Sequence, residues 1–243
     1  MQAWGLTDPG CVRVQNQDAY GVHTFEEDSL LCTVCDGMGG AKSGNVASSL
    51  ALQIFMQEVT RLRKPGMSQE QAGQMFREAV RLANFTVYDQ SRQFEDFEGM
   101  GTTLVAAYVD HRMAVIANVG DSRCYLLNRE GVRCLTTDHS LVQLMVQRGE
   151  LSREQAKNYP GKNLITRAIG TEPGVECDLF YQPVQKGDYL LLCTDGLSNL
   201  LDDQEILFEV VHGVNKQLCC QRLLGICQER GAPDNVTSVL IVI

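Results

Sequence analysis

Four aspartates lie at the ends of predicted strands or in tight turns, each beside a glycine or a turn-forming residue: Asp36, Asp121, Asp195 and Asp234. Hard cations such as Mg²⁺ and Mn²⁺ bind carboxylate and carbonyl oxygens. A neighbouring glycine lets the backbone approach an ion closely and offer its own carbonyl. The four aspartates are therefore candidate cation ligands, although each one alone is more typical of an ordinary turn.

The segment 36–40, Asp-Gly-Met-Gly-Gly, also allows a second interpretation, a glycine loop that cradles a phosphate. It lacks the G-x-G-x-x-G pattern of dinucleotide-binding loops and the Gly-Lys-Ser/Thr of P-loops. An aspartate at its start would repel a phosphate unless a metal ion lay between them. The segment therefore favours a metal site first and a phosphate site second.

Strands and helices that would position these residues alternate along the whole chain. Residues 18–24 and 29–35 flank the acidic turn 26–28 and predict a hairpin. Apolar residues at helical spacing predict amphipathic helices over 46–59 and 69–93. Four short β-rich runs joined by short turns then predict an antiparallel meander over 103–109, 113–119, 123–127 and 132–135.

The C-terminal half mixes both kinds of element. A helix is expected over 141–147, and Ser152-x-x-Gln155 and Asp202-x-x-Glu205 have the pattern of capping boxes that open further helices. Strands over 176–183, 188–193 and 236–243 and a helix over 215–229 complete the prediction. No linker or repeat divides the 243 residues, so we expect a single α+β domain over 1–243.

Composition excludes several functions. The net charge of −9 argues against nucleic-acid binding and against an anionic membrane surface. The chain shows neither a signal peptide nor an apolar stretch of about 18 residues, so a cytoplasmic protein without a membrane span is expected. The ten cysteines are scattered, and Cys32-x-x-Cys35 has no second pair to complete a zinc site, which indicates free thiols.

Taken in order, a set of motifs resembles the protein phosphatase 2C family, in its bacterial form, across essentially the whole chain. The matching stretches are Thr7–Arg13, Asn16–Ala19, Val34–Gly40, Gly101–Leu104, Asn118–Arg123, Leu135–Ser140, Ile165–Gly170, Cys193–Leu197 and Asp234–Thr237. The resemblance implies an αββα sandwich of two antiparallel sheets flanked by helices. It also implies a metal-dependent protein serine/threonine phosphatase that acts on phosphorylated proteins, opposes a Ser/Thr protein kinase and works as a monomer.

The resemblance also implies a ligand set for two Mg²⁺ or Mn²⁺ ions. Asp36 would bridge the two ions, the carbonyl of Gly37 would bind one, and Asp195 and Asp234 would bind the other. A hydroxide bridging the ions would attack phosphorus in line, without a phosphoenzyme. In agreement, none of the ten cysteines begins the C-x5-R loop of cysteine-dependent phosphatases.

Three further roles follow from the resemblance. Asp18 would orient water bound to the ions, Asp121 together with Asp195 would bind a third ion, and Arg13 would hold the substrate phosphate. A guanidinium suits that last task because it binds phosphate oxygens through two parallel hydrogen bonds. Residues 138–172 would form a flap beside the site, with a turn at 158–161.

The chain departs from the family pattern at two positions. Met38 stands where many eukaryotic relatives have a histidine proposed as general acid, and Gln17 stands where an acidic residue is usual. His139 lies within a motif and receives no role. A phosphatase-like binding module without catalysis, and a phosphatase for a non-protein phosphoester, remain as alternatives. Retention of the metal carboxylates disfavours the first, and only the shape of the pocket would decide the second.

Overall fold

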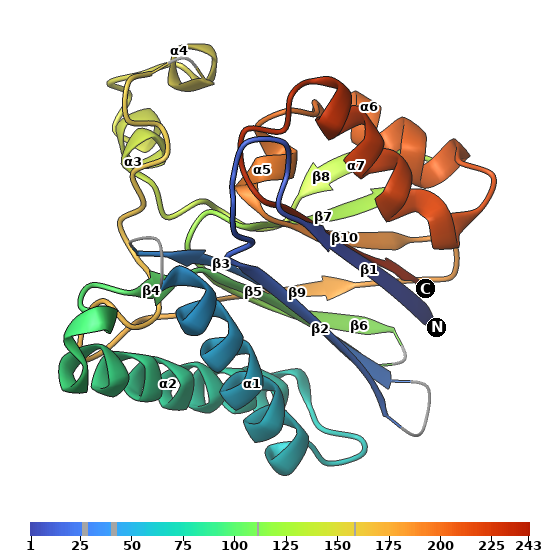
Figure 1. Ribbon diagram of the computed structural model, residues 1–243. Helices are drawn as coiled ribbons and strands as arrows, with labels where there is room; N and C mark the ends of the chain where they lie inside the picture. The colour runs from blue at the N-terminus through green and yellow to red at the C-terminus, as the bar shows by residue number, and fades with distance from the viewer. Residues whose placement is uncertain (26–28, 40–42, 111, 158) are drawn as a thin grey trace.

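The computed structural model describes residues 1–25, 29–39, 43–110, 112–157 and 159–243. Two antiparallel sheets pack face to face, and helices cover their outer faces (Figure 1). One sheet has the order β1 (Gln2–Asp8), β11 (Val236–Val242), β10 (Tyr189–Cys193), β7 (Arg123–Asn128) and β8 (Gly131–Cys134). The other has the order β2 (Asp18–Phe25), β3 (Ser29–Met38), β5 (Leu104–Asp110), β6 (Met113–Val119) and β9 (Asp178–Pro183), with β4 (Gly101–Thr102) paired to the end of β3.

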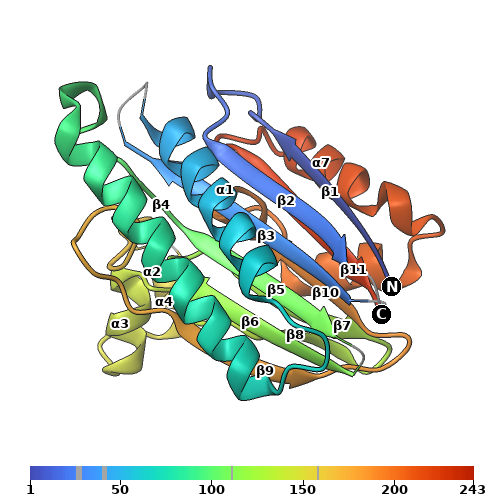
Figure 2. The ribbon, with the colours of Figure 1, turned by 90° about the horizontal axis from the view of Figure 1, so that it is seen from below.

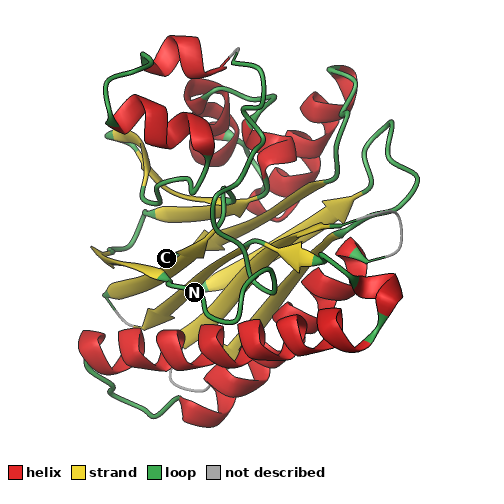
Figure 3. Ribbon diagram, turned by 90° about the vertical axis from the view of Figure 1, so that its left-hand side faces the viewer, coloured by secondary structure: helices red, strands yellow, loops and turns green. Residues whose placement is uncertain are grey.

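Helices form the two outer layers, as Figures 2 and 3 show. The β2-β3-β5-β6-β9 sheet is covered by α1 (Gly44–Leu62) and α2 (Gln69–Gln93), after which a 3-10 turn spans Glu95–Phe97. The other sheet is covered by α5 (Asp195–Ser198), α6 (Asp203–Leu207) with a π turn at Phe208–His212, a 3-10 turn at Lys216–Leu218, and α7 (Cys219–Glu229). No helix in the described ranges combines the length and the apolar character needed to cross a membrane.

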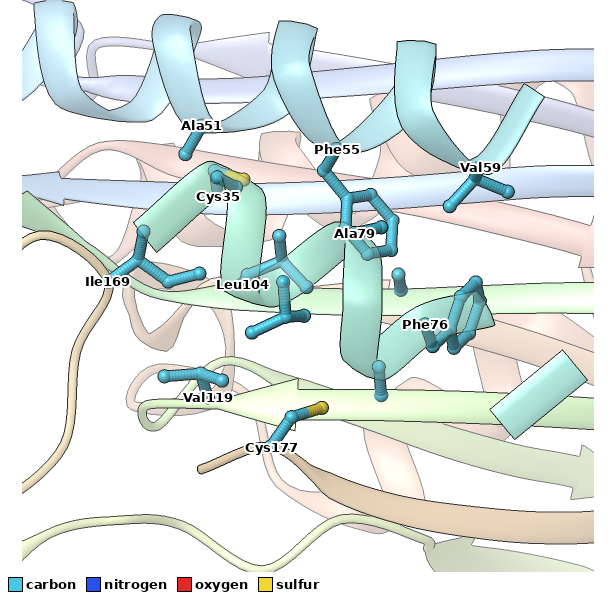
Figure 4. Close-up of a cluster of buried hydrophobic side chains, with 14 of the residues drawn as sticks. Cys35, Ala51, Phe55, Val59, Phe76, Ala79, Leu104, Val119, Ile169 and Cys177 are labelled. Carbon is cyan, nitrogen blue, oxygen red and sulfur yellow. The ribbon is translucent and has the colours of Figure 1, made fainter. Parts of the chain in front are cut away.

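Strand β3 shows why the sheet is buried on both faces. Side chains alternate along a strand, so Leu31 and Cys35 join the core under α1 and α2, while Leu30 and Val34 join the core between the sheets. On the helix side, Phe55 of α1 meets Phe76 of α2 with ring centroids 5.4 Å apart (Figure 4). The continuous apolar run of β3 thus packs against both neighbouring layers.

The structure confirms the predicted αββα architecture and most of the predicted elements. The hairpin of β2 and β3 is present, and the helices predicted over 46–59 and 69–93 are α1 and α2. The capping boxes at Ser152 and Asp202 both form. The turn at 26–28, Gly40 of the glycine segment and Asn158 of the 158–161 turn lie outside the described residues.

The predicted meander is wrong at one turn. Strands β5 and β6 pair with each other, but β7 pairs with β10 and β8 in the opposite sheet. The connection at 120–122 therefore crosses from one sheet to the other. Gly120 permits this because its φ of +106° is strained for other residues, and a Cβ there would lie 2.5 Å from the side chain of Thr103. A local pattern identifies neighbouring strands but not a change of sheet.

Helices α3 (Leu141–Gln147) and α4 (Arg153–Lys157) stand away from the sandwich at one end (Figure 1). The segment 138–172 that contains them is attached at its base, where Ser140 pairs with Ile165 and Thr102 pairs with Ile169. The two chain termini lie together at the other end of the sheets.

Candidate metal centre

The hairpin of β2 and β3 places two acidic residues side by side, because Asp18 pairs with Asp36 in register. The backbone of Asp36 is held on both sides. Its N–H donates to the hydroxyl of Thr103 (2.9 Å), and its carbonyl accepts from the Thr103 N–H (2.8 Å) and the Thr102 hydroxyl (2.9 Å). Strand β3 continues to Met38 instead of ending at Asp36, because Gly37 and Met38 pair with β4.

Asp18 is buried, with 8% of its surface exposed, and its two carboxylate oxygens are in different situations. Oδ2 accepts hydrogen bonds from the hydroxyls of Thr194 (3.0 Å) and Thr237 (2.7 Å). Oδ1 is buried and has no hydrogen-bond partner among the described residues. A buried carboxylate oxygen without a partner is costly, and a water molecule on a bound cation would satisfy it.

Asp195 and Asp234 approach the same end of the sandwich from the opposite sheet. Asp195 is the first residue of α5, and its Oδ2 accepts from Asn199 (3.0 Å). Asp234 lies in the turn before β11, where Oδ1 accepts from the N–H of Asn235 (2.9 Å) and Oδ2 accepts from Arg13 (2.9 Å). Each side chain is oriented by a partner close in the chain or by the N-terminal loop.

The buried Asn235 fixes the N-terminal loop against this end of the molecule. Its Oδ1 accepts from the N–H of Gln17 (2.8 Å), and its Nδ2 donates to the carbonyls of Pro9 and Gln15 (both 3.0 Å). Arg13 lies within the stretch so held. The sequence alone indicates no role for Asn235, because a turn residue that binds backbone atoms more than 200 positions away leaves no local pattern.

Two glycines allow the backbone to pack closely around the carboxylates. A Cβ on Gly37 would lie 2.1 Å from the carbonyl oxygen of Gly44, and one on Gly196 would lie 1.9 Å from that of Asn235. Real Cβ atoms do not tolerate such contacts, so the residues after Asp36 and Asp195 must be glycine. The carbonyl of Gly37 is the backbone oxygen implied as an ion ligand.

The carboxylates raise one another's pKa. Desolvation raises the pKa of Asp36 well above its usual value, and the charges of Asp18, Asp195, Asp121 and Asp234 raise it further. Desolvation also raises the pKa of Asp18 to about 7, against hydrogen bonds from the two threonine hydroxyls. The pKa of Asp121 is raised to about 7 by desolvation and then by Asp195. Like charges close together in a desolvated site disfavour ionisation.

This donor set fits a hard divalent cation. It combines several carboxylates, a backbone carbonyl and an orphaned carboxylate oxygen, all of which are oxygen ligands. In the described part of the chain, no three acidic, histidine or cysteine side chains are already drawn together around one point.

The remaining predicted site residues lie around this group. Asp121 is half-buried in the turn that joins the two sheets. Arg13 is exposed over 54% of its side chain, and its hydrogen bond to Asp234 comes first among the causes that raise its pKa, with the charges of Asp36 and Asp195 adding to it. Met38 is half-buried at the end of β3. His139, without a role from the sequence, is buried at the base of the segment 138–172.

Comparisons with known proteins identify the family of this chain. The family model of protein phosphatase 2C matches residues 13–223. The serine/threonine phosphatase stp of Listeria monocytogenes is 38% identical over 246 residues, covering 99% of this chain and 95% of the relative. The crystal structure of the serine/threonine phosphatase Stp1 from Staphylococcus aureus superposes with a TM-score of 0.93 at 35% identity, covering 100% of this chain and 94% of that one.

A further solved structure bears on the metal. It is the catalytic domain of the serine/threonine protein phosphatase PstP in complex with two manganese ions, with a TM-score of 0.84, 32% identity and coverage of 98% of this chain and 96% of that one. The Listeria relative and the two solved structures align with nearly the full length of this chain. The chain therefore belongs to the protein phosphatase 2C family.

Proposed function

We propose that the protein is a metal-dependent phosphatase that hydrolyses phosphoserine and phosphothreonine in proteins. The observation that carries this proposal is the group of mutually repelling carboxylates at one end of the sandwich, which lies beside an exposed arginine. Membership of the protein phosphatase 2C family supports the reaction class. The activities named for its bacterial relatives support protein substrates.

Asp36, the Gly37 carbonyl, Asp195 and Asp234 would hold two Mn²⁺ or Mg²⁺ ions. Asp121, whose pKa is raised by Asp195, would contribute to a third ion. The manganese ions bound by PstP support the choice of metal. When bound, such ions would lower the pKa of a coordinated water and neutralise negative charge on the phosphate oxygens.

The side chains of the protein bind the substrate phosphate and orient water. Arg13 binds the substrate phosphate with its guanidinium, exchanging its exposed hydrogen bond to Asp234 for bidentate bonds to phosphate oxygens. Asp18 orients water through Oδ1, the oxygen that no described residue satisfies, while Oδ2 stays fixed by the two threonines. Met38 has no proton to donate, so it cannot serve as the general acid for the leaving alkoxide.

A non-catalytic binding module is the weaker alternative, since every carboxylate of the ligand set is present. We further propose that residues 1–243 act as one domain, as a monomer in the cytoplasm, opposing a Ser/Thr protein kinase. The free state of all ten cysteines supports a reducing compartment. Residues 138–172 would act as a flap that reads the substrate. Exchanging this segment with that of a relative should change the preference among phosphopeptides and spare hydrolysis of p-nitrophenyl phosphate.

The test is hydrolysis of a phosphothreonine peptide and of p-nitrophenyl phosphate with Mn²⁺, with Mg²⁺ and with EDTA. We expect metal-dependent turnover of both substrates and its loss in Asp36→Asn and Asp195→Asn. The exposed Asp203→Asn is a charge-matched control that should keep full activity. Turnover that survives EDTA, or both site variants, would refute the proposal. Turnover of small phosphoesters without phosphopeptides would favour a non-protein substrate.

A further inference from the structure

Asp138 and His139, at the base of the segment 138–172, bind the residues on either side of the turn that carries Asp121. On one side, Arg123 makes a bidentate ion pair with Asp138, with its Nη2 2.6 Å and its Nε 3.0 Å from the two carboxylate oxygens. On the other side, Gly120 is bonded to His139 twice. Its carbonyl accepts from the His139 backbone N–H (2.9 Å), and its N–H donates to Nδ1 of the imidazole (3.0 Å).

The imidazole of His139 is itself oriented from the opposite side. Its Nε2 lies 3.1 Å from Oδ2 of Asp178, and Arg167 donates to Oδ1 of the same carboxylate (2.7 Å) with its Nη1 3.2 Å from Nε2. Because Nδ1 accepts a hydrogen bond from Gly120, the proton of the neutral ring must be on Nε2. Burial and the charge of Arg167 lower the pKa of His139, which favours this neutral ring.

Further hydrogen bonds connect this turn to Asp36. Ser122, the residue after Asp121, has its hydroxyl 2.8 Å from the hydroxyl of Thr103, which also accepts from the N–H of Asp36. Residues 138–139 begin the segment that carries α3 and α4, and Thr166 near its other end donates to the carbonyl of His139 (2.7 Å). Hydrogen bonds therefore join the base of this segment to the turn at 120–122, and that turn to Asp36 in β3.

We propose that Asp138 and His139 are positioning residues that set the placement of Asp121 for ion binding and couple it to the base of the segment 138–172. This inference rests on the proposed function, in which Asp121 is an ion ligand. His139 does not touch substrate or ion in this account. It acts through the Gly120 peptide, and its tautomer determines whether that peptide is held.

Two substitutions at one position separate the two bonds of the imidazole. In His139→Asn, the amide oxygen takes the place of Nδ1 and keeps an acceptor for Gly120, while the bond to Asp178 is lost. In His139→Gln, the longer side chain reaches Asp178 and leaves the Gly120 N–H without its acceptor. Both variants are polar and uncharged, so a general loss of packing would affect them alike.

Binding of Mn²⁺ to metal-free protein, followed by electron paramagnetic resonance of the free ion, gives a readout that does not require activity. We expect the weakest Mn²⁺ site to lose affinity by roughly tenfold or more in His139→Gln, the scale set by a lost buried hydrogen bond. In His139→Asn the same site should stay within about threefold of wild type, since the acceptor is retained. Activity should follow the same order and be restored to His139→Gln by excess Mn²⁺.

The wild-type protein provides a second test that needs no variant to fold. With ¹⁵N-labelled histidine, the His139 resonances, assigned by their loss in His139→Asn, should show a protonated Nε2 and an unprotonated Nδ1. A protonated Nδ1, or equal Mn²⁺ affinity in the two variants, would overturn the inference. If wild type binds Mn²⁺ but hydrolyses no phosphoester, the proposed function fails, while the tautomer and the affinities still test the positioning role.

Discussion

The pKa of acidic side chains is lowered in some regions of this molecule and raised in another. Asp178 lies between Arg167 and His139, whose hydrogen bonds outweigh partial burial and lower its pKa. Hydrogen bonds from Arg230 and from the backbone of Asp202 lower the pKa of Glu205 to about 2. At the carboxylate end of the sandwich, desolvation and neighbouring charges instead raise the pKa of Asp18 and Asp36.

The difference shows that the site of Asp18 and Asp36 lacks a buried cationic partner among the described residues. Elsewhere a basic side chain of the protein lies within hydrogen-bond distance of the carboxylate that it stabilises, as in the bidentate pair of Arg123 and Asp138. Arg13 does reach the carboxylate end, but through an exposed bond to Asp234. The fold therefore places negative charge there that a divalent cation neutralises far better than any described side chain, and the following predictions test that contrast.

The largest effect is expected at Asp36. Asp36→Asn removes the charge that all four neighbouring aspartates act upon, and kcat of phosphopeptide hydrolysis should fall on the order of 10³-fold, the scale of lost electrostatic stabilisation in an active site. The measurement is steady-state kinetics at saturating Mn²⁺, with Asp203→Asn as the exposed control. A fall no larger in Asp36→Asn than in the control would remove the distinction between the two regions.

An intermediate effect is expected at Asp18. Asp18→Asn keeps the shape that accepts from Thr194 and Thr237 but replaces a carboxylate that orients water at the ions. Activity or Mn²⁺ affinity should fall roughly 10- to 100-fold, as for residues that support metal ligands without touching the metal. Calorimetric titration with Mn²⁺ measures it, and unchanged affinity together with unchanged activity would place Asp18 outside the metal centre.

Arg13 should affect substrate binding more than turnover. Arg13→Lys keeps the charge but cannot form two parallel bonds to phosphate, so KM for the phosphopeptide should rise about tenfold with a smaller change in kcat. The thermal midpoint should stay nearly unchanged, because an exposed ion pair such as that with Asp234 contributes little to stability. A fall confined to kcat would assign Arg13 a different role.

The last effect has the opposite sign and appears without metal. The folded-state pKa of Asp18 is raised from 3.8 to about 7, so its protonated form stabilises the fold below pH 4, and that stability is lost as pH rises through 7. Asp18→Asn avoids the buried charge. In metal-free protein its free energy of unfolding, relative to wild type, should increase by roughly 3 to 4 kcal/mol between pH 4 and pH 7.5.

Urea unfolding of both proteins in EDTA at several pH values measures this difference. Added Mn²⁺ should reverse it by stabilising wild type more than Asp18→Asn, since only ligand bound to the folded state adds stability. A relative stability that does not change with pH would show that Asp18 is not destabilised by ionisation.

The sequence was sufficient for those features that depend on local pattern. The apolar stripe of α2 and the capping boxes at Ser152 and Asp202 follow from spacing alone. The family motifs then implied the sandwich and the ligand positions. Strand β1 received no prediction, because its residues are only half-buried and the strand is recognised by its pairing with β11.

Features that depend on contacts between distant residues could not be predicted from the sequence. Three features join residues that are not neighbours in the chain. They are the change of sheet at 120–122, the anchoring of the N-terminal loop by Asn235, and the two hydrogen bonds between His139 and Gly120. The sequence marks these residues as polar positions in turns but does not say what they contact. These same contacts determine where Asp121 and Arg13 lie.

Anomalous diffraction at the manganese edge from crystals grown with Mn²⁺ tests the central claim most directly. We expect two strong peaks, one on each side of Asp36, with the Gly37 carbonyl, Asp195 and Asp234 as the other protein ligands, and a weaker third peak at Asp121. Peaks at other carboxylates with none at Asp36, or crystals in which Asp36→Asn keeps the full set of peaks, would contradict it.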